Sequence, residues 1–154
     1  MKKSAVIFFT FLIIVSFSGC SVPSAPKDEV LASLGKYTSK QYYTDGGFQD
    51  YTDYAKYTFD SVDFSNNSYF TSLTEDSKAD LTAHIDNFEG WIQTIQNTNP
   101  ENEVVLQYDF DRSVISDADY LYIYDNPAYS EFGCYTVYYF DTETNTLYYF
   151  HNNI

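Results

Sequence analysis

The segment that decides the fold spans residues 74–97, TEDSKADLTAHIDNFEGWIQTIQN. At about 100° per residue, its apolar positions fall within an arc of roughly 120° on a helix. The spacing therefore predicts an amphipathic helix that lies on a core, capped by Ser72 or Thr74 and stopped at residues 97–100. The positions on this arc are Leu81, His84, Ile85, Phe88, Trp91, Ile92 and Ile95.

The chain before this helix gives weaker signals. Residues 27–35 predict a short helix, because a proline precedes them, acids open them and a glycine ends them. Residues 37–47 are polar and aromatic and end in a turn sequence. Within residues 48–62 the apolar side chains share one helical face and favour a second helix. A strand through residues 55–59 is the alternative, since Tyr, Thr and Phe are common in strands.

After residue 100 the hydrophobic period changes from 3.6 to 2. Alternating side chains at 104–110, 119–124, 133–140 and 146–150 predict four strands joined by short turns. Helices followed by strands are typical of the α+β class. We therefore expect one or two N-terminal helices packed on one face of a four-stranded antiparallel meander, with the other face in water.

The first 19 residues have the composition of a secretory signal. Lys2 and Lys3 form a short basic region, and an uncharged, mostly apolar run follows at residues 4–18. That run is shorter than the roughly 20 residues that a membrane-spanning helix needs. We therefore leave residues 1–19 out of the fold prediction.

The end of this segment, Phe17-Ser18-Gly19-Cys20, resembles the lipobox of bacterial lipoproteins. Phe17 stands where that class usually has Leu or another aliphatic residue. The resemblance implies that a diacylglycerol is attached to the Cys20 sulfur and that the signal is cut just before it. Fatty acyl chains such as palmitate would then hold the protein on the extracytoplasmic face of the cell membrane. An ordinary secretory signal and an N-terminal membrane anchor are the alternatives.

This interpretation divides the chain into a signal (1–19), a lipidated Cys20 with a short tether (20–26) and one α+β domain (27–154). The chain has two cysteines, so a lipidated Cys20 leaves Cys134 without a disulfide partner. Cys134 lies in an apolar strand pattern and is expected to be a small buried residue. Removing Lys2 and Lys3 changes the net charge from −14 to −16. Such an acidic chain excludes nucleic acid as a partner, because nucleic-acid binders need a basic surface.

A second set of candidate residues is acidic. Residues 109–113 begin with the Asp-x-Asp-x-Ser spacing of a calcium loop, but Val114 and Tyr120 stand where the loop needs Gly and Glu. A weak calcium site is therefore a minor alternative to solvated loop acids. Its four candidate ligands are Asp109, Asp111, Asp117 and Asp119. A weaker acidic group comprises Asp45, Asp50 and Asp53.

The two histidines have no metal-ligand spacing. His84 lies on the apolar arc of the main helix and is expected to be a satisfied core or boundary residue.

Tyrosine is the most unusual residue type in the chain, with 17 copies. Its rigid ring and polar tip suit recognition of protein, peptide or sugar. Tyrosine also suits half-buried sheets without any ligand. The candidate binding residues on the outer sheet face are Tyr120, Tyr122, Tyr124, Tyr135 and Tyr139.

Two functions follow from these features. The first is a membrane-anchored extracytoplasmic lipoprotein that acts as a non-catalytic binding or interaction module for a cell-surface protein, peptide or glycan. In one variant it sequesters a cationic peptide. The alternative is an acidic-residue hydrolase that acts on cell-envelope polymers, which would need two or more of the named carboxylates to meet in one cleft.

Overall fold

The computed structural model describes residues 28–46 and 50–154 and has an α+β fold. Residues 1–27, which include the predicted signal, Cys20 and the tether, lie outside the described residues. The strands are β1 Ser39–Gly46, β2 Tyr51–Thr58, β3 Thr71–Ser72, β4 Tyr120–Asp125, β5 Cys134–Asp141 and β6 Thr146–Asn153. The helices are α1 Glu29–Ser33, α2 Glu75–Thr98, α3 Glu103–Gln107 and the 3-10 helix η1 Arg112–Val114.

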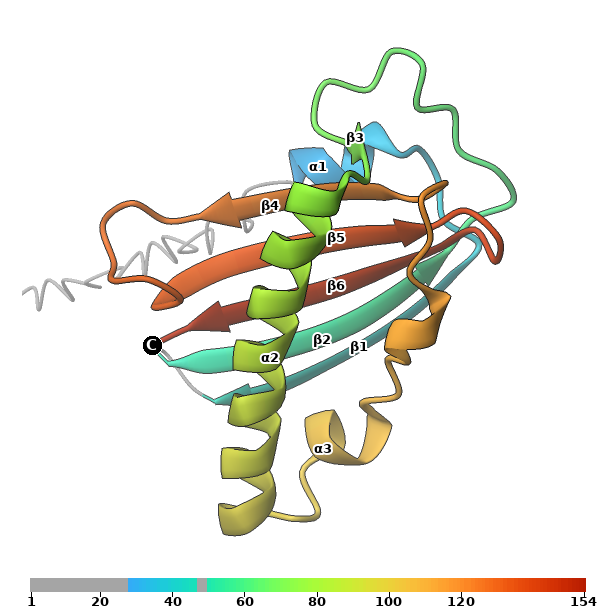
Figure 1. Ribbon diagram of the computed structural model, residues 1–154. Helices are drawn as coiled ribbons and strands as arrows, with labels where there is room; N and C mark the ends of the chain where they lie inside the picture. The colour runs from blue at the N-terminus through green and yellow to red at the C-terminus, as the bar shows by residue number, and fades with distance from the viewer. Residues whose placement is uncertain (1–27, 47–49) are drawn as a thin grey trace, which may run out of the picture.

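The strands form one antiparallel sheet in the order β1-β2-β6-β5-β4-β3, and α2 crosses one face of it (Figure 1). The predicted main helix is thus confirmed as α2. Thr74 caps its start: Thr74 Oγ1 accepts a 3.2 Å hydrogen bond from the Ser77 N–H, and the Thr74 N–H donates to Ser77 Oγ at 2.8 Å. Six of the seven positions on the predicted arc are buried, whereas Trp91 is half-buried.

The predicted helix at residues 48–62 is wrong. Tyr51–Thr58 instead forms β2, which is hydrogen-bonded to β1 on one side and to β6 on the other. Residues 52–55 are all buried, so the side chains on both faces of β2 are covered. A strand covered on both faces carries apolar residues at neighbouring positions rather than alternately. Apolar residues at neighbouring positions also occur on one face of a helix, so this part of the sequence was wrongly predicted to be helical.

The predicted four-stranded meander is also wrong, because the sheet has six strands. The chain at residues 104–110 does not join the sheet; it begins with the short helix α3. Asn102 caps this helix by accepting a 2.8 Å hydrogen bond from the Val104 N–H. The place beside β6 is taken instead by β2, which comes from the N-terminal half of the chain.

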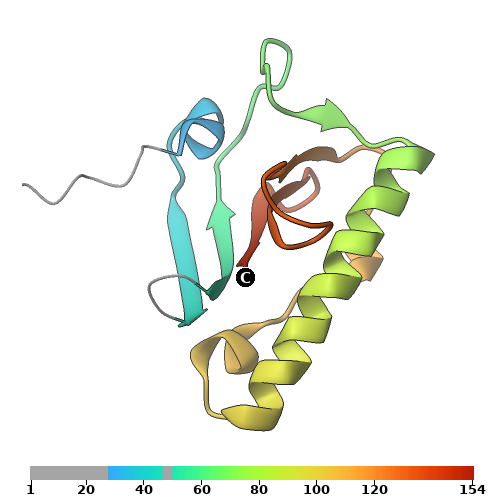
Figure 2. The same ribbon diagram turned by 90° about the vertical axis from the view of Figure 1, so that its left-hand side faces the viewer.

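Both faces of the sheet are covered in part, each by its own apolar cluster. Under α2, side chains such as Leu81, Ile85 and Phe88 pack on Tyr54 and Phe150 of the sheet. On the other face, α1 and the loop at 59–70 pack on a second cluster that includes Phe140 and Leu147. Figure 2 shows α1 and α2 on opposite sides of the sheet. The expectation that the second face simply meets water is therefore corrected.

Within residues 28–46 and 50–154, no helix combines enough length with enough apolar character to cross a bilayer.

Candidate functional site

A pocket of about 600 Å³ lies between the first half of α2 and the connection from β4 to β5. This volume falls within the range typical of small-ligand sites. The helix contributes Asp80, Ala83 and His84, and the end of β4 contributes Ile123 and Asp125. The rest of the wall comes from the β4–β5 connection, at Asn126, Pro127, Tyr129, Ser130, Glu131 and Phe132.

His84 makes two polar contacts in the pocket wall. It is 7% exposed, and its Nδ1 lies 2.8 Å from the Asp80 carbonyl oxygen. Its Nε2 lies 2.9 Å from Oδ1 of Asp125, which reaches across from β4. Both partners are acceptors, so each contact is a hydrogen bond when the ring nitrogen that faces it carries a proton. The prediction that His84 is a satisfied boundary residue is confirmed.

Aromatic rings surround this histidine. The ring centroid of His84 lies 5.0 Å from that of Phe132 and 5.0 Å from that of Tyr135, both at edge-on angles. Burial, and secondarily the charge of Asp125, raise the pKa of the Tyr135 hydroxyl, which keeps this group neutral. Tyr135 is therefore an uncharged ring that packs edge-on against His84.

The backbone at Phe132 is strained. Its φ of 57° places a bulky residue in the left-handed region that normally favours glycine. Such strain persists only where the surrounding structure enforces it. Here the contacts of Phe132 with His84 and Tyr135 hold the ring against the pocket wall.

The electrostatic character of the pocket is acidic. Asp80, Asp125 and Glu131 line it, and its described lining residues include no Lys or Arg. Tyr129, which is 46% exposed, adds an aromatic surface to the acidic wall. Carboxylates and open aromatic faces both attract cations. The pocket is thus suited to a positively charged group with some apolar surface.

The five tyrosines predicted as a binding surface do not share one face of the sheet. Tyr135 and Tyr139 are 0% exposed and belong to the cluster under α2. Tyr120 and Tyr122 are half-buried against the cluster on the other face, and Tyr124 is exposed at 48%. The alternation along β4 and β5 separates the two sets, because facing residues such as Tyr122 and Tyr138 share a face while Tyr139 points the opposite way.

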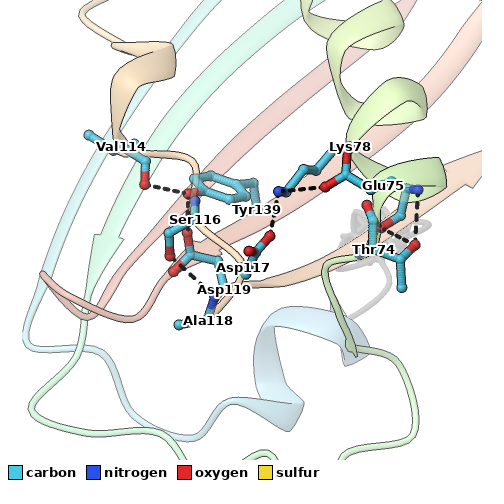
Figure 3. Close-up of polar contacts among 10 residues, drawn as sticks. Thr74, Glu75, Lys78, Val114, Ser116, Asp117, Ala118, Asp119 and Tyr139 are labelled. Carbon is cyan, nitrogen blue, oxygen red and sulfur yellow. Dashed lines mark hydrogen bonds and ion pairs between the residues drawn. The ribbon is translucent and has the colours of Figure 1, made fainter.

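The four acids predicted as calcium ligands are each engaged separately. Asp109 pairs with Lys56 and accepts a 2.7 Å hydrogen bond from the Tyr54 hydroxyl, and Asp111 caps η1. Asp117 forms an ion pair with Lys78, whereas Asp119 is buried beside Tyr139 (Figure 3). In the part of the chain that the structure describes, no three His, Cys, Asp or Glu side chains are grouped to hold a metal ion.

The weaker acidic group, Asp45, Asp50 and Asp53, does not lie on one face of the sheet. Asp45 and Asp50 line a smaller pocket on the α2 side, where Asp45 accepts a hydrogen bond from Asn102. Asp53 is 4% exposed on the other face, beside Tyr42 and His151. Burial is the main cause that raises the pKa of the Tyr42 hydroxyl, with the Asp53 charge and hydrogen bond adding to it.

The remaining candidates for chemistry are His151 and Cys134. His151 Nδ1 lies 2.7 Å from the Thr136 hydroxyl, and burial lowers the pKa of the imidazole despite the nearby Asp53 carboxylate. Cys134 is a free thiol at the start of β5 and is half-buried rather than fully buried.

Sequence reasoning singled out His84 but missed the rest of the pocket. Tyr129, Glu131 and Phe132 lie in a loop that carries no periodic pattern, and they meet α2 only through the fold. Comparison with known proteins adds no further assignment, since no protein-family model matches the chain and neither a curated protein nor a solved structure is significantly similar to it.

Proposed function

We propose that this protein is a lipid-anchored extracytoplasmic lipoprotein that acts as a non-catalytic binding module for a cationic group of a peptide or protein. The observation that carries this proposal is the pocket bounded by α2 and the β4–β5 connection. Its walls combine acids and aromatic rings, and His84 and Asp125 fix one side of it. The net charge of −14 over the whole chain adds long-range attraction for a cationic partner.

The guanidinium group of arginine matches this lining well. It presents five N–H donors to carboxylates and stacks on aromatic faces. Asp80 and Glu131 are exposed and lie on the pocket wall, whereas Asp125 already accepts from His84. Asp80 and Glu131 are therefore the carboxylates available to a ligand, with Tyr129 as the neighbouring ring.

The binding proposal is tested by titration of the full-length chain, in a polyoxyethylene detergent, with N-acetyl-arginine amide. Its neutral counterpart, N-acetyl-citrulline amide, serves as the ligand control. The double variant Asp80→Asn/Glu131→Gln should weaken arginine-amide binding by about tenfold, because two rim carboxylates at about 0.7 kcal/mol each sum to that factor. The variant Asp60→Asn/Glu143→Gln removes the same charge from two exposed sites outside the pocket and should bind as the parent does.

Equal binding of the arginine and citrulline probes contradicts the cationic ligand. Equal weakening by both double variants also contradicts it, because a general charge effect would then explain the loss.

The anchor is a separate part of the proposal and rests on the resemblance of residues 17–20 to a lipobox. Two acyl chains suffice for stable membrane attachment. The mass of the N-terminal peptide from protein recovered from its native host should show an acylated Cys20. Cys20→Ser should move the protein from the membrane fraction to the soluble fraction. An unmodified Cys20 in native protein contradicts the anchor and leaves the pocket untouched.

The hydrolase alternative gains less support. Asp45 and Asp50 are the two predicted acids that line one pocket together, and Asp45 is already engaged by Asn102. We therefore propose the binding module in preference to the hydrolase.

A further inference from the structure

A second, smaller pocket of about 210 Å³ lies at the other end of α2. The helix supplies Trp91, Thr94, Ile95 and Thr98, and the sheet supplies Tyr51 and Thr52 of β2 and Asn152 and Asn153 of β6. Asp45, Asp50 and Ile154 complete the lining. This volume is below the range of typical drug-sized sites, so the pocket suits a single small ring rather than an extended ligand.

Trp91 is the first unusual feature of this pocket. It is the single tryptophan of the chain and lies on the apolar arc of α2, yet it remains half-buried and belongs to neither apolar cluster. Its neighbours on the same arc, Phe88 and Ile92, are buried. A large aromatic surface is thus available in the pocket wall.

Asn152 is the second unusual feature, and it is independent of the first. It is 0% exposed, and its Oδ1 accepts a 3.0 Å hydrogen bond from the Thr52 hydroxyl. Its Nδ2 has no hydrogen-bond partner among the described residues. A buried amide donor without an acceptor is costly, and nearly all such groups in proteins find one. Nδ2 of Asn152 therefore lacks an acceptor among the described protein atoms, and a ligand could supply one.

The carboxylates of Asp45 and Asp50 impose the opposite requirement. Both are acceptors only, and Oδ1 of Asp45 already accepts from Asn102, so a ligand can bring donors to the other oxygen of Asp45 and to Asp50. A bare cation satisfies the acids but offers no acceptor to Asn152. A carboxylate-bearing ligand satisfies Asn152 but enters a pocket whose described lining has two acids and no Lys, Arg or His. A hydroxyl group both donates and accepts, and it is neutral.

We infer that this pocket binds one neutral pyranose unit of a glycan, with its hydroxyl groups on Asp45, Asp50 and Asn152 and its apolar C–H face on Trp91. The inference goes beyond the proposed function, because it concerns a different pocket and a different ligand class. It gives the protein a second binding site at the far end of α2 from His84.

The single tryptophan supplies a direct test. The full-length chain in a polyoxyethylene detergent, which contains no sugar, is titrated with the methyl β-pyranosides of glucose, galactose and N-acetylglucosamine while Trp91 emission is followed. At least one probe should change the emission in a saturable manner. Asp50→Asn, at an exposed residue, should weaken that binding by several fold, and Asp60→Asn should leave it unchanged. Trp91→Phe, followed by calorimetry, should retain weaker binding because a smaller aromatic face remains.

Two results overturn the inference. One is the absence of a saturable change with all three pyranosides; the other is a saturable change with free leucine or with N-acetyl-arginine amide in their place. This test is independent of the test of the proposed function, because the two concern different pockets. Asp80→Asn/Glu131→Gln should therefore leave pyranoside binding unchanged.

Discussion

Tyr139 on β5 donates a 2.6 Å hydrogen bond from its hydroxyl to Oδ2 of Asp119, and both side chains are buried (Figure 3). The same carboxylate accepts from the Ser116 N–H at 2.8 Å and from the Thr142 N–H and hydroxyl at 2.9 and 3.0 Å. Asp119 thus joins the loop after η1 to the β5–β6 turn. It is a buried charge whose acceptor positions are filled by protein donors.

Asp119→Ala should therefore lower the free energy of unfolding by about 3 kcal/mol, because it leaves several buried donors without an acceptor. Urea denaturation followed by circular dichroism measures this change. Asp117→Ala is the matched control, since that neighbouring acid is exposed and pairs with Lys78 at the surface. Its effect should stay within about 1 kcal/mol. Equal effects of the two variants would contradict the structural role of Asp119.

The same carboxylate makes stability depend on pH. Burial alone would raise the Asp119 pKa, but hydrogen bonds from Tyr139, Thr142 and Ser116 outweigh it and lower the pKa below its ordinary value of 3.8. In acid the unfolded state therefore binds this proton more readily than the folded state does. The stabilisation is full above the unfolded pKa and is lost as pH falls through the folded pKa.

Asp119→Asn should flatten the loss of stability below about pH 4, measured as urea midpoints from pH 2 to 7. Asp109 should preserve part of the slope, since hydrogen bonds from Lys56 and Tyr54 also lower its pKa against the effect of burial. A parallel acid profile in parent and variant would show that the titration of Asp119 is not linked to folding.

The accuracy of the sequence-based prediction differed sharply between elements. For α2 a cap, an acidic first turn and a continuous apolar arc all agreed, and the helix is where they place it. The expected short helix at residues 27–35 is confirmed as α1, and the alternating segments around β4, β5 and β6 are strands. For β2, burial on both faces removed the period-2 signal, so local spacing favoured the wrong element.

The candidate site was less accessible to sequence reasoning than the fold. The acids at 109–119 are close in sequence, yet they have separate partners in the structure. Asp109 contacts Lys56 and Tyr54, Asp117 contacts Lys78, and Asp119 contacts Tyr139. The pocket on α2 instead combines His84 with residues about 40 or more positions later. Its loop residues have no periodicity, and the single sequence contains no signal for that long-range contact.

The aromatic cluster under α2 should be sensitive to loss of volume. Phe88 is 0% exposed and lies edge-on to Phe150 with ring centroids 5.3 Å apart. Phe88→Ala should cost about 3–5 kcal/mol of unfolding free energy, because it removes a large buried ring and leaves a cavity. Leu106→Ala, at a residue that is 62% exposed, should change it by less than about 0.5 kcal/mol. Urea denaturation of both variants checks the contrast, and a small effect of Phe88→Ala would contradict the packing described for α2.

The start of α2 offers a prediction about capping. Thr74→Ala removes the side chain that accepts from the Ser77 N–H and should destabilise the protein by about 1 kcal/mol. Thr82→Ala, in the exposed middle of the same helix, should be neutral or stabilising by about 0.5 kcal/mol, since alanine has the higher helix propensity. Thermal unfolding of the pair gives the sign of each change. If both variants lower the melting temperature equally, the cap contributes nothing specific.

The last prediction separates the support of the proposed cation pocket from its ligand contacts. His84→Phe keeps an aromatic ring beside Phe132 and Tyr135 but removes the bonds to the Asp80 carbonyl and to Asp125. The Asp125 carboxylate, freed from its partner, becomes a further acceptor for a cationic ligand. We therefore expect a loss of about 1–2 kcal/mol in unfolding free energy together with tighter binding of N-acetyl-arginine amide. Urea denaturation and calorimetric titration measure the two effects on the same sample. Weaker binding by this variant would show that the imidazole itself contacts the ligand, which contradicts the assignment of His84 to the supporting wall.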